Sequence, residues 1–186
     1  MKINVNDIKI GMFIEFKNDL WEVIKTQHVK PGKGGAFNQV EMKSVFSGTK
    51  INERFRSSQT VEKASIEETK FTYLYEDQEN YCFMNKNNFE QINMTKKLVG
   101  QKGILLSENL EVSISFHDDK PILIDLPKQI NSKIVYTEAS IKGQTVSSSY
   151  KPAILDNELK IQVPPFINIG DKIIIDTRTL EYLKKV

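Results

Sequence analysis

A single lysine stands at the centre of a glycine-rich turn, Pro31-Gly32-Lys33-Gly34-Gly35, between two runs that alternate like strands. Proline holds φ at about −65° and glycine accepts positive φ, so this composition predicts a narrow loop tip. Lys33 is then the one long side chain at the tip, where it could present its ammonium group to a closely approaching partner. The alternative is a solvated hairpin end, because the same residue types are common in loops.

Other candidate chemistry is sparse. The loop is not a phosphate-binding P-loop, because its lysine is followed by glycine and a strand pattern rather than by Ser or Thr opening a helix. His28 and His117 lie far apart, and Cys82 is the only cysteine, so no metal-ligand or disulfide spacing is present. We interpret the stretch 117–119 as a solvated hairpin turn and Cys82 as a core residue. The residues therefore give little support to an enzyme.

The segments that would position the loop alternate with a period of two, which is typical of strands. Residues 20–24 are predicted to form a strand before the loop. After it, residues 38–43 alternate between an apolar and a polar face. Residues 50–56 repeat the pattern and place three cations on one face, namely Lys50, Arg54 and Arg56. The loop is therefore expected at the end of a hairpin, next to a cationic strand.

The same alternation continues to the C-terminus, and one short helix is expected within residues 95–106. Short strands separated by frequent turns predict small barrels. We predict three β units, at 1–63, 64–127 and 128–186. Aromatic residues of the middle unit could form a base-stacking platform, but a core role is preferred because that unit is acidic. These residues are Tyr73, Tyr75, Tyr81 and Phe83.

Composition and charge narrow the class of protein. The 186 residues are 39% hydrophobic and 27% charged, as in ordinary globular proteins. No run reaches the roughly 18 to 20 apolar residues of a membrane span, and no secretory signal is visible at the start, so we expect a cytoplasmic protein. Net charge is +4 for 1–63, −5 for 64–127 and +3 for 128–186. A polyanion such as nucleic acid would favour the outer thirds, although three solvated surfaces could also differ by chance.

Several separated stretches occur in an order that is typical of one bacterial family: Val29–Gly34, Thr72–Tyr75, Phe83–Asn85, Phe89–Gln91 and Val163–Arg178. On these stretches the chain resembles bacterial elongation factor P over essentially its whole length. The resemblance implies an all-β fold of three small barrels in an L-shaped, tRNA-like arrangement. The first, 1–63, would be a KOW-like (SH3-like) barrel that carries the Lys33 loop. The others, 64–127 and 128–186, would be OB-folds.

The resemblance also implies a function and partners. Proteins of this family bind the 70S ribosome beside peptidyl-tRNA, prolyl or initiator, contact ribosomal and messenger RNA, and relieve stalling at consecutive prolines. Lys33 matches the lysine that many members carry extended by a β-lysyl or another amine-bearing group. We therefore expect covalent modification of Lys33 by a lysine-modifying enzyme, with no other cofactor, no metal and no catalytic residue. A monomer that binds no membrane is expected.

The candidate RNA contacts are the loop tip, Pro31 to Gly35, and a set in the outer thirds: Lys30, Lys50, Arg54, Arg56, Gly143, Gln144, Thr145 and Lys151. Many relatives have Gly-Asp-Thr where this chain has residues 143–145, and a glycine where it has Glu158. A stand-alone OB-fold protein that binds single-stranded nucleic acid is the alternative function. A small-molecule enzyme using the glycine loop is a third.

Overall fold

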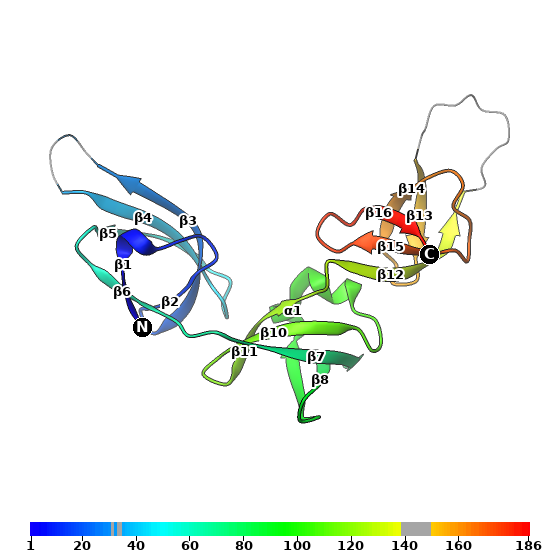
Figure 1. The fold of residues 1–186 in the computed structure, drawn as a ribbon, viewed down its shortest axis with the longest axis horizontal. Coiled ribbons are helices and arrows are strands. Elements are labelled where there is room, and N and C mark those ends of the chain that lie inside the picture. Colours follow the sequence, from blue (N-terminus) through cyan, green and yellow to red (C-terminus); the bar gives the residue numbers. More distant parts are fainter. Residues whose placement is uncertain (31, 33–34, 139–149) are drawn as a thin grey trace. The chain divides into compact units, whose positions relative to one another are not determined.

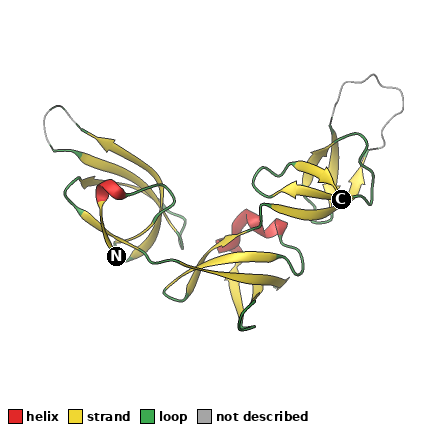
Figure 2. Cartoon of the chain, viewed as in Figure 1, coloured by secondary structure: helices red, strands yellow, loops and turns green. Residues whose placement is uncertain are grey.

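The computed structural model describes residues 1–30, 32, 35–138 and 150–186, and almost all regular structure within them is β (Figure 2). The described residues form two compact units, Met1–Thr69 with Ile114–Leu123 and Lys70–Ser113 with Ile124–Val186. The all-β prediction is confirmed. The predicted domain boundaries, 1–63, 64–127 and 128–186, and the L-shaped arrangement stay predictions.

A six-stranded sheet lies in the first unit, with strands in the order β1-β6-β2-β3-β4-β5 among the described residues (Figure 1). Its strands are β1 (Lys2–Asn4), β2 (Phe13–Phe16), β3 (Asp19–Val29), β4 (Phe37–Ser44), β5 (Lys50–Arg56) and β6 (Thr60–Lys63). A 3-10 turn, η1 (Val5–Asp7), follows β1. The side chains that close this barrel include Val5, Ile14, Val40 and Met42, which are 0–1% exposed. The Trp21 indole Nε1 donates to the Phe16 carbonyl over 2.7 Å.

A five-stranded sheet follows, in the order β11-β10-β7-β8-β9 among the described residues. Its elements are β7 (Glu67–Glu76), β8 (Asn80–Asn85), β9 (Gln91–Thr95), α1 (Lys96–Val99), η2 (Gly100–Leu105), β10 (Glu111–His117) and β11 (Lys120–Asp125). The one helix expected within 95–106 is confirmed as α1 followed by η2, and the Thr95 hydroxyl accepts a hydrogen bond from the Leu98 amide at its start.

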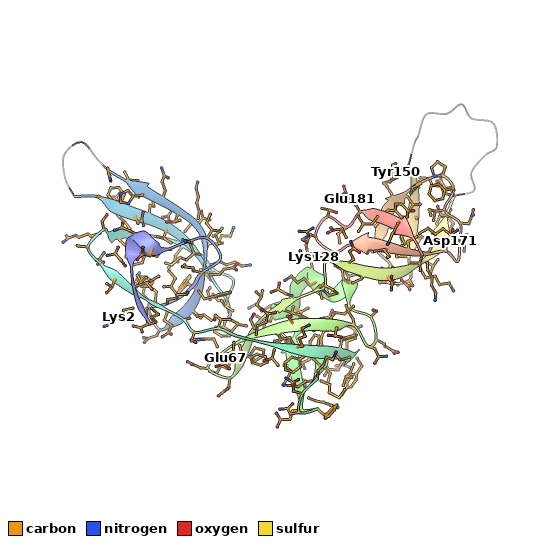
Figure 3. The ribbon with its side chains drawn as sticks, viewed as in Figure 1. Lys2, Glu67, Lys128, Tyr150, Asp171 and Glu181 are labelled. Carbon is orange, nitrogen blue, oxygen red and sulfur yellow. The ribbon has the colours of Figure 1, made fainter. Side chains whose placement is uncertain are left out.

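The third sheet has the order β14-β13-β12-β15-β16 among the described residues. Its strands are β12 (Gln129–Thr137), β13 (Lys151–Leu155), β14 (Lys160–Val163), β15 (Lys172–Asp176) and β16 (Tyr182–Lys185). Inward-facing aliphatic side chains such as Ile134, Leu155 and Ile173 are completely buried. Leu105 from η2 packs into this cluster, so η2 adds to the same core. At the surface, Lys185 Nζ lies 2.7 Å from the carboxylate of Asp171, which is labelled in Figure 3.

Two of the four aromatic residues considered for the stacking platform, Tyr73 and Phe83, belong to the core, and Tyr81 is half-buried. Tyr73 and Phe83 are 7% and 0% exposed, and their ring centroids lie 5.6 Å apart. Cys82 is also buried, as predicted. Tyr75 differs, because it is 56% exposed after a register shift between β7 and β8. A continuous stacking platform of all four rings is therefore not present.

The interpretation of His117 as part of a solvated turn is wrong. Its side chain is only 12% exposed, and its Nδ1 lies 3.0 Å from the Ser65 carbonyl oxygen. Asp118 and Asp119 do make the turn, with φ of 48° and 61°. The hairpin packs on the N-terminal barrel because Ile122 is buried in a cluster with Leu20 and Ala64. Sequence alternation predicted the turn but could not predict what covers it.

Candidate nucleic-acid interface

The loop that carries Lys33 is held by the β3–β4 hairpin, whose strands pair antiparallel up to Val29 opposite Phe37. Gly32 and Gly35 are exposed, and a Cβ added at either would meet no atom within 4 Å. The free protein therefore leaves room for side chains at both positions, so any requirement for glycine there would come from a partner. Three residues of the predicted tip lie outside the described residues: Pro31, Lys33 and Gly34.

Below the loop, strands β3, β4 and β5 present a cationic face on the outside of the barrel. One row across the strands consists of Gln27, Gln39 and Arg54. The cations of this face are Lys25, Lys43, Lys50, Arg54 and Arg56, and its acids are Glu22 and Glu41. Among the described residues, no ion pair joins any of these five cations to a carboxylate, so all five keep their charge available to a polyanion.

The alternation predicted for β4 and β5 creates this face. Val40 and Met42 point into the core with 0% exposure, and their neighbours in sequence point out. On β3, a register shift between Val23 and Lys25 adds one residue and turns Lys25 to the outside, opposite Glu41. The shift keeps polar side chains on one surface along the whole hairpin.

Arg54 is oriented by an aromatic neighbour. Its guanidinium carbon lies 4.1 Å from the centroid of the Phe37 ring. A guanidinium stacked on a ring keeps its in-plane N–H groups free, and these groups match the geometry of a phosphate. Arg56 lies directly opposite Phe37 across the β4–β5 pair. The two arginines therefore sit at the end of the cationic face that is nearest the loop.

The other predicted contacts lie in different places. Lys30 is exposed directly after β3 and lines a hollow on the inner side of the hairpin together with His28. Lys151 is 9% exposed, and its Nζ donates to the Glu138 carbonyl over 2.6 Å, so a direct phosphate contact is not favoured there. The sequence carried the signal for this burial, because Lys151 shares its strand face with Ala153 and Leu155. Residues 143–145 lie outside the described residues.

Sequence reasoning missed a lysine cluster on the third sheet. Lys133 lies opposite Lys172 across β12 and β15, and Lys184 lies opposite Ile174 across β15 and β16. All three lysines are exposed. Period-two alternation could have found Lys133, because its neighbours Ser132 and Ile134 are buried. A second cationic surface is thus available in the C-terminal third.

The two largest pKa shifts, at Asp176 and Tyr73, are caused by hydrogen bonds within the fold and by burial. Hydrogen bonds from the Arg178 side chain, and then from its backbone amide, lower the pKa of Asp176 to about 2. Burial, and secondarily the charge of Glu76, raises the pKa of Tyr73 to about 12.

Among the described residues, no group of three or more His, Cys, Asp or Glu side chains could hold a metal ion. In the same residues, no helix is long and apolar enough to cross a membrane.

Comparison with known sequence families matches three segments in order. Residues 4–61 match the elongation factor P KOW-like domain, 66–124 the elongation factor P OB domain, and 130–185 the elongation factor P C-terminal domain. Elongation factor P of Pelagibacter ubique is 63% identical over 186 residues, covering 100% of both chains. The chain belongs to the elongation factor P family. It is therefore classed with translation elongation factors and not with enzymes.

Further relatives agree with this membership of the elongation factor P family. Elongation factor P of Bartonella bacilliformis is 48% identical, covering 100% of this chain and 98% of its own. Among solved structures, eukaryotic translation initiation factor 5A from Methanococcus jannaschii is similar with a TM-score of 0.58 and 21% identity, covering 67% of this chain and 93% of that one. This last likeness supports the fold alone.

The structure explains one departure from the elongation factor P pattern. Glu158, where many relatives were expected to have glycine, has φ of 66°. Its amide donates to the Leu155 carbonyl in a tight turn between β13 and β14. Glycine adopts this left-handed conformation without strain, whereas a side chain with a Cβ does not. The glutamate is tolerated, and its cost is local to the turn.

Proposed function

We propose that this member of the elongation factor P family binds the ribosome beside peptidyl-tRNA and relieves stalling at consecutive prolines. In this proposal the Lys33 loop tip reaches the end of the peptidyl-tRNA, and the cationic face binds RNA phosphates alongside it. The single observation that carries the proposal is a face of five cations on β3, β4 and the adjacent strand β5, none of which forms an ion pair with a carboxylate among the described residues. A tip of this kind next to a phosphate-binding surface is suited to positioning an RNA end.

Positioning alone is sufficient chemistry for the role. Holding two reactants in attack geometry can contribute up to about 7 to 11 kcal/mol in well-oriented model reactions. Proline is a constrained and poor reactant, so its peptidyl transfer has the most to gain from an ordered tRNA end. No group on the factor needs to transfer a proton or form a covalent bond with the substrate.

The expected covalent extension of Lys33 belongs to the same proposal. An amine-bearing group added to the Lys33 Nζ would lengthen the cation beyond the glycine tip and keep its positive charge. The open space around Gly32 and Gly35 is consistent with a tip whose width is limited by a partner rather than by the protein itself. A lysine-modifying enzyme is the corresponding partner.

A reporter assay tests this function. A reconstituted translation system that lacks the factor would synthesise two reporters, one with consecutive prolines and one without. Wild-type protein should restore only the polyproline reporter, and Lys33→Ala should not. Lys17→Gln is the matched control, because Lys17 is exposed, lies off the cationic face and pairs with Glu53 over 3.1 Å. Full restoration by Lys33→Ala would refute the proposal.

The alternative of a stand-alone protein for single-stranded nucleic acid has less support. It would use an exposed platform of aromatic side chains for base stacking, and two of the four rings predicted for that platform, Tyr73 and Phe83, are buried instead. Such a protein would bind free RNA tightly with a steep salt dependence, whereas the ribosome-dependent proposal expects tight binding to stalled ribosomes.

A further inference from the structure

The hairpin that carries the loop has a polar hollow on its inner side. The cavity measures about 580 Å³, within the roughly 300 to 1,000 Å³ that is usual for small-molecule sites. Its polar lining comes from η1, from both strands of the hairpin and from the segment after β5: Asn6, Thr26, His28, Lys30, Asn38 and Ser57. This hollow is separate from the outward cationic face.

The hollow forms where the hairpin extends past the apolar core. Thr26 pairs with Val40, which is fully buried, and the next inward pair towards the loop is His28 with Asn38. From that pair onward His28, Asn38 and Lys30 replace the aliphatic side chains of the core, and Ala36 and Ile8 complete the lining of the hollow. The barrel therefore ends in a hydrogen-bonding mouth directly below the loop.

Two buried polar atoms in this mouth have no partner among the described residues, the Asn38 Oδ1 and the Ser57 Oγ. Asn38 is 3% exposed, and its Nδ2 donates to the Val5 carbonyl over 2.8 Å. Because a carbonyl can only accept, this bond fixes the amide orientation and leaves Oδ1 as an unused acceptor. Buried polar atoms without partners are uncommon and destabilising, so a ligand that supplies a donor would be favoured.

We propose that this hollow is a binding site for one unpaired nucleobase of RNA. The amino group of the base would donate to Asn38 Oδ1, the Ser57 hydroxyl would meet a neighbouring polar group, and Lys30 would meet the adjoining phosphate. Asn38 and Ser57 both line the hollow, so a small adjustment of their side chains would bring the two buried polar atoms to the base. Unpaired RNA bases are commonly recognised through such edges.

The chemistry of the site predicts which bases it takes. Adenine, cytosine and guanine carry an exocyclic amino group with two N–H donors, whereas uracil has no amino group and offers only the single N3–H at a different position of the ring. Cytosine and uracil are otherwise nearly the same size and have the same sugar and phosphate. The site should therefore prefer cytidine over uridine nucleotides. This inference rests on the proposed function, because it takes RNA to be the partner of the hairpin.

Titration of the full-length protein with CMP and with UMP, followed by NMR of its backbone amides, tests the proposal. CMP should bind about 2- to 10-fold more tightly than UMP, the range of one hydrogen bond. The affected amides should include those of Thr26, His28, Asn38 and Ser57. Equal affinities, no binding of either nucleotide, or shifts confined to the cationic face would each overturn the proposal.

Variants assign the preference to the named atoms. Asn38→Leu keeps a similar volume and removes the acceptor, so it should abolish the preference for CMP. Ser57→Ala removes one hydroxyl and should weaken CMP binding even if Asn38→Leu does not fold. Lys17→Gln, at an exposed site away from the hollow, is the control and should leave the CMP-to-UMP ratio unchanged. An unchanged ratio in Asn38→Leu together with unchanged affinity in Ser57→Ala would contradict the assignment.

The two proposals fail separately. If CMP and UMP bind equally but Lys33→Ala abolishes polyproline synthesis, only the nucleobase site is wrong. If the base preference is found but Lys33→Ala retains full activity, the site stands and the role of the loop tip is wrong.

Discussion

Neutralising the cationic face should weaken ribosome binding, because phosphate contacts are lost. The loss should also make the remaining affinity depend less steeply on salt concentration. The triple variant Lys50→Gln, Arg54→Gln, Arg56→Gln removes three of the five cations on the face and retains side chains of similar length. These three positions lie on one edge strand, β5, so the change does not reach the core residues Val40 and Met42. The fold should therefore persist.

The magnitude follows from counterion release. Each cation that meets a phosphate contributes about 0.7 to 0.9 to the slope of log affinity against log salt. Three lost contacts lower the slope by about 2 to 3. When salt rises from 50 to 200 mM, the affinity of wild type should therefore fall by a factor about 20 to 40 times larger than the factor by which the affinity of the variant falls. Loss of the Arg54–Phe37 contact should cost about 0.5 to 1 kcal/mol of folding stability, which a thermal melt would show as a small decrease in Tm.

The assay is binding of fluorescently labelled protein to ribosomes stalled at consecutive prolines, measured at several KCl concentrations. The matched control is Lys70→Gln, Lys97→Gln, Lys120→Gln, which removes three exposed lysines from the acidic middle third. This control should retain the wild-type slope. The same slope in the β5 triple variant and wild type, with both proteins folded, would refute the assignment of this face to RNA phosphates.

Two further predictions concern stability and titration. Glu158→Gly relieves a φ of 66° and should stabilise the protein by about 0.5 to 1 kcal/mol, seen as a higher denaturant midpoint; a lower midpoint would contradict the strain argument. The pKa of Asp176 is lowered from 3.8 to about 2 by Arg178, so its stabilising contribution is complete above pH 3.8 and is lost as pH falls through about 2. NMR titration of the Asp176 carboxyl should give that midpoint, and Arg178→Gln should raise it; an identical midpoint in the variant would exclude Arg178 as the cause.

Much of the cationic face could be predicted from alternation alone. Residues 38–43 and 50–56 carry strict period-two patterns, and in each strand one face must be buried, so Lys50, Arg54 and Arg56 had to point outwards. The hairpin end was equally clear from the proline and glycines. Lys25 could not be assigned in this way, because the register shift after Val23 reverses the parity of β3 and leaves no mark in the sequence.

The remaining differences depend on contacts between distant residues. His117 is covered by Ser65 and Glu15, which lie close to it in space but 52 and 102 positions earlier in the chain. No local sequence pattern predicts contacts between residues so far apart. The burial of Lys151 is a matter of strand parity, because it shares a face with Ala153 and Leu155 and its Nζ donates to the Glu138 carbonyl. Its contact with RNA stays a prediction. The hollow at Asn38 also needed coordinates, because its lining combines η1, the hairpin and Ser57.

The most direct test of the central claim is the rate of a single prolyl-prolyl peptide bond in a reconstituted ribosome, measured with wild-type protein and with Lys33→Ala. Positioning by the loop tip predicts that wild type accelerates this bond and leaves a bond between two non-proline residues unchanged. Lys33→Ala should lose the acceleration while still binding the stalled ribosome through the cationic face. An undiminished prolyl-prolyl rate with Lys33→Ala would contradict the claim.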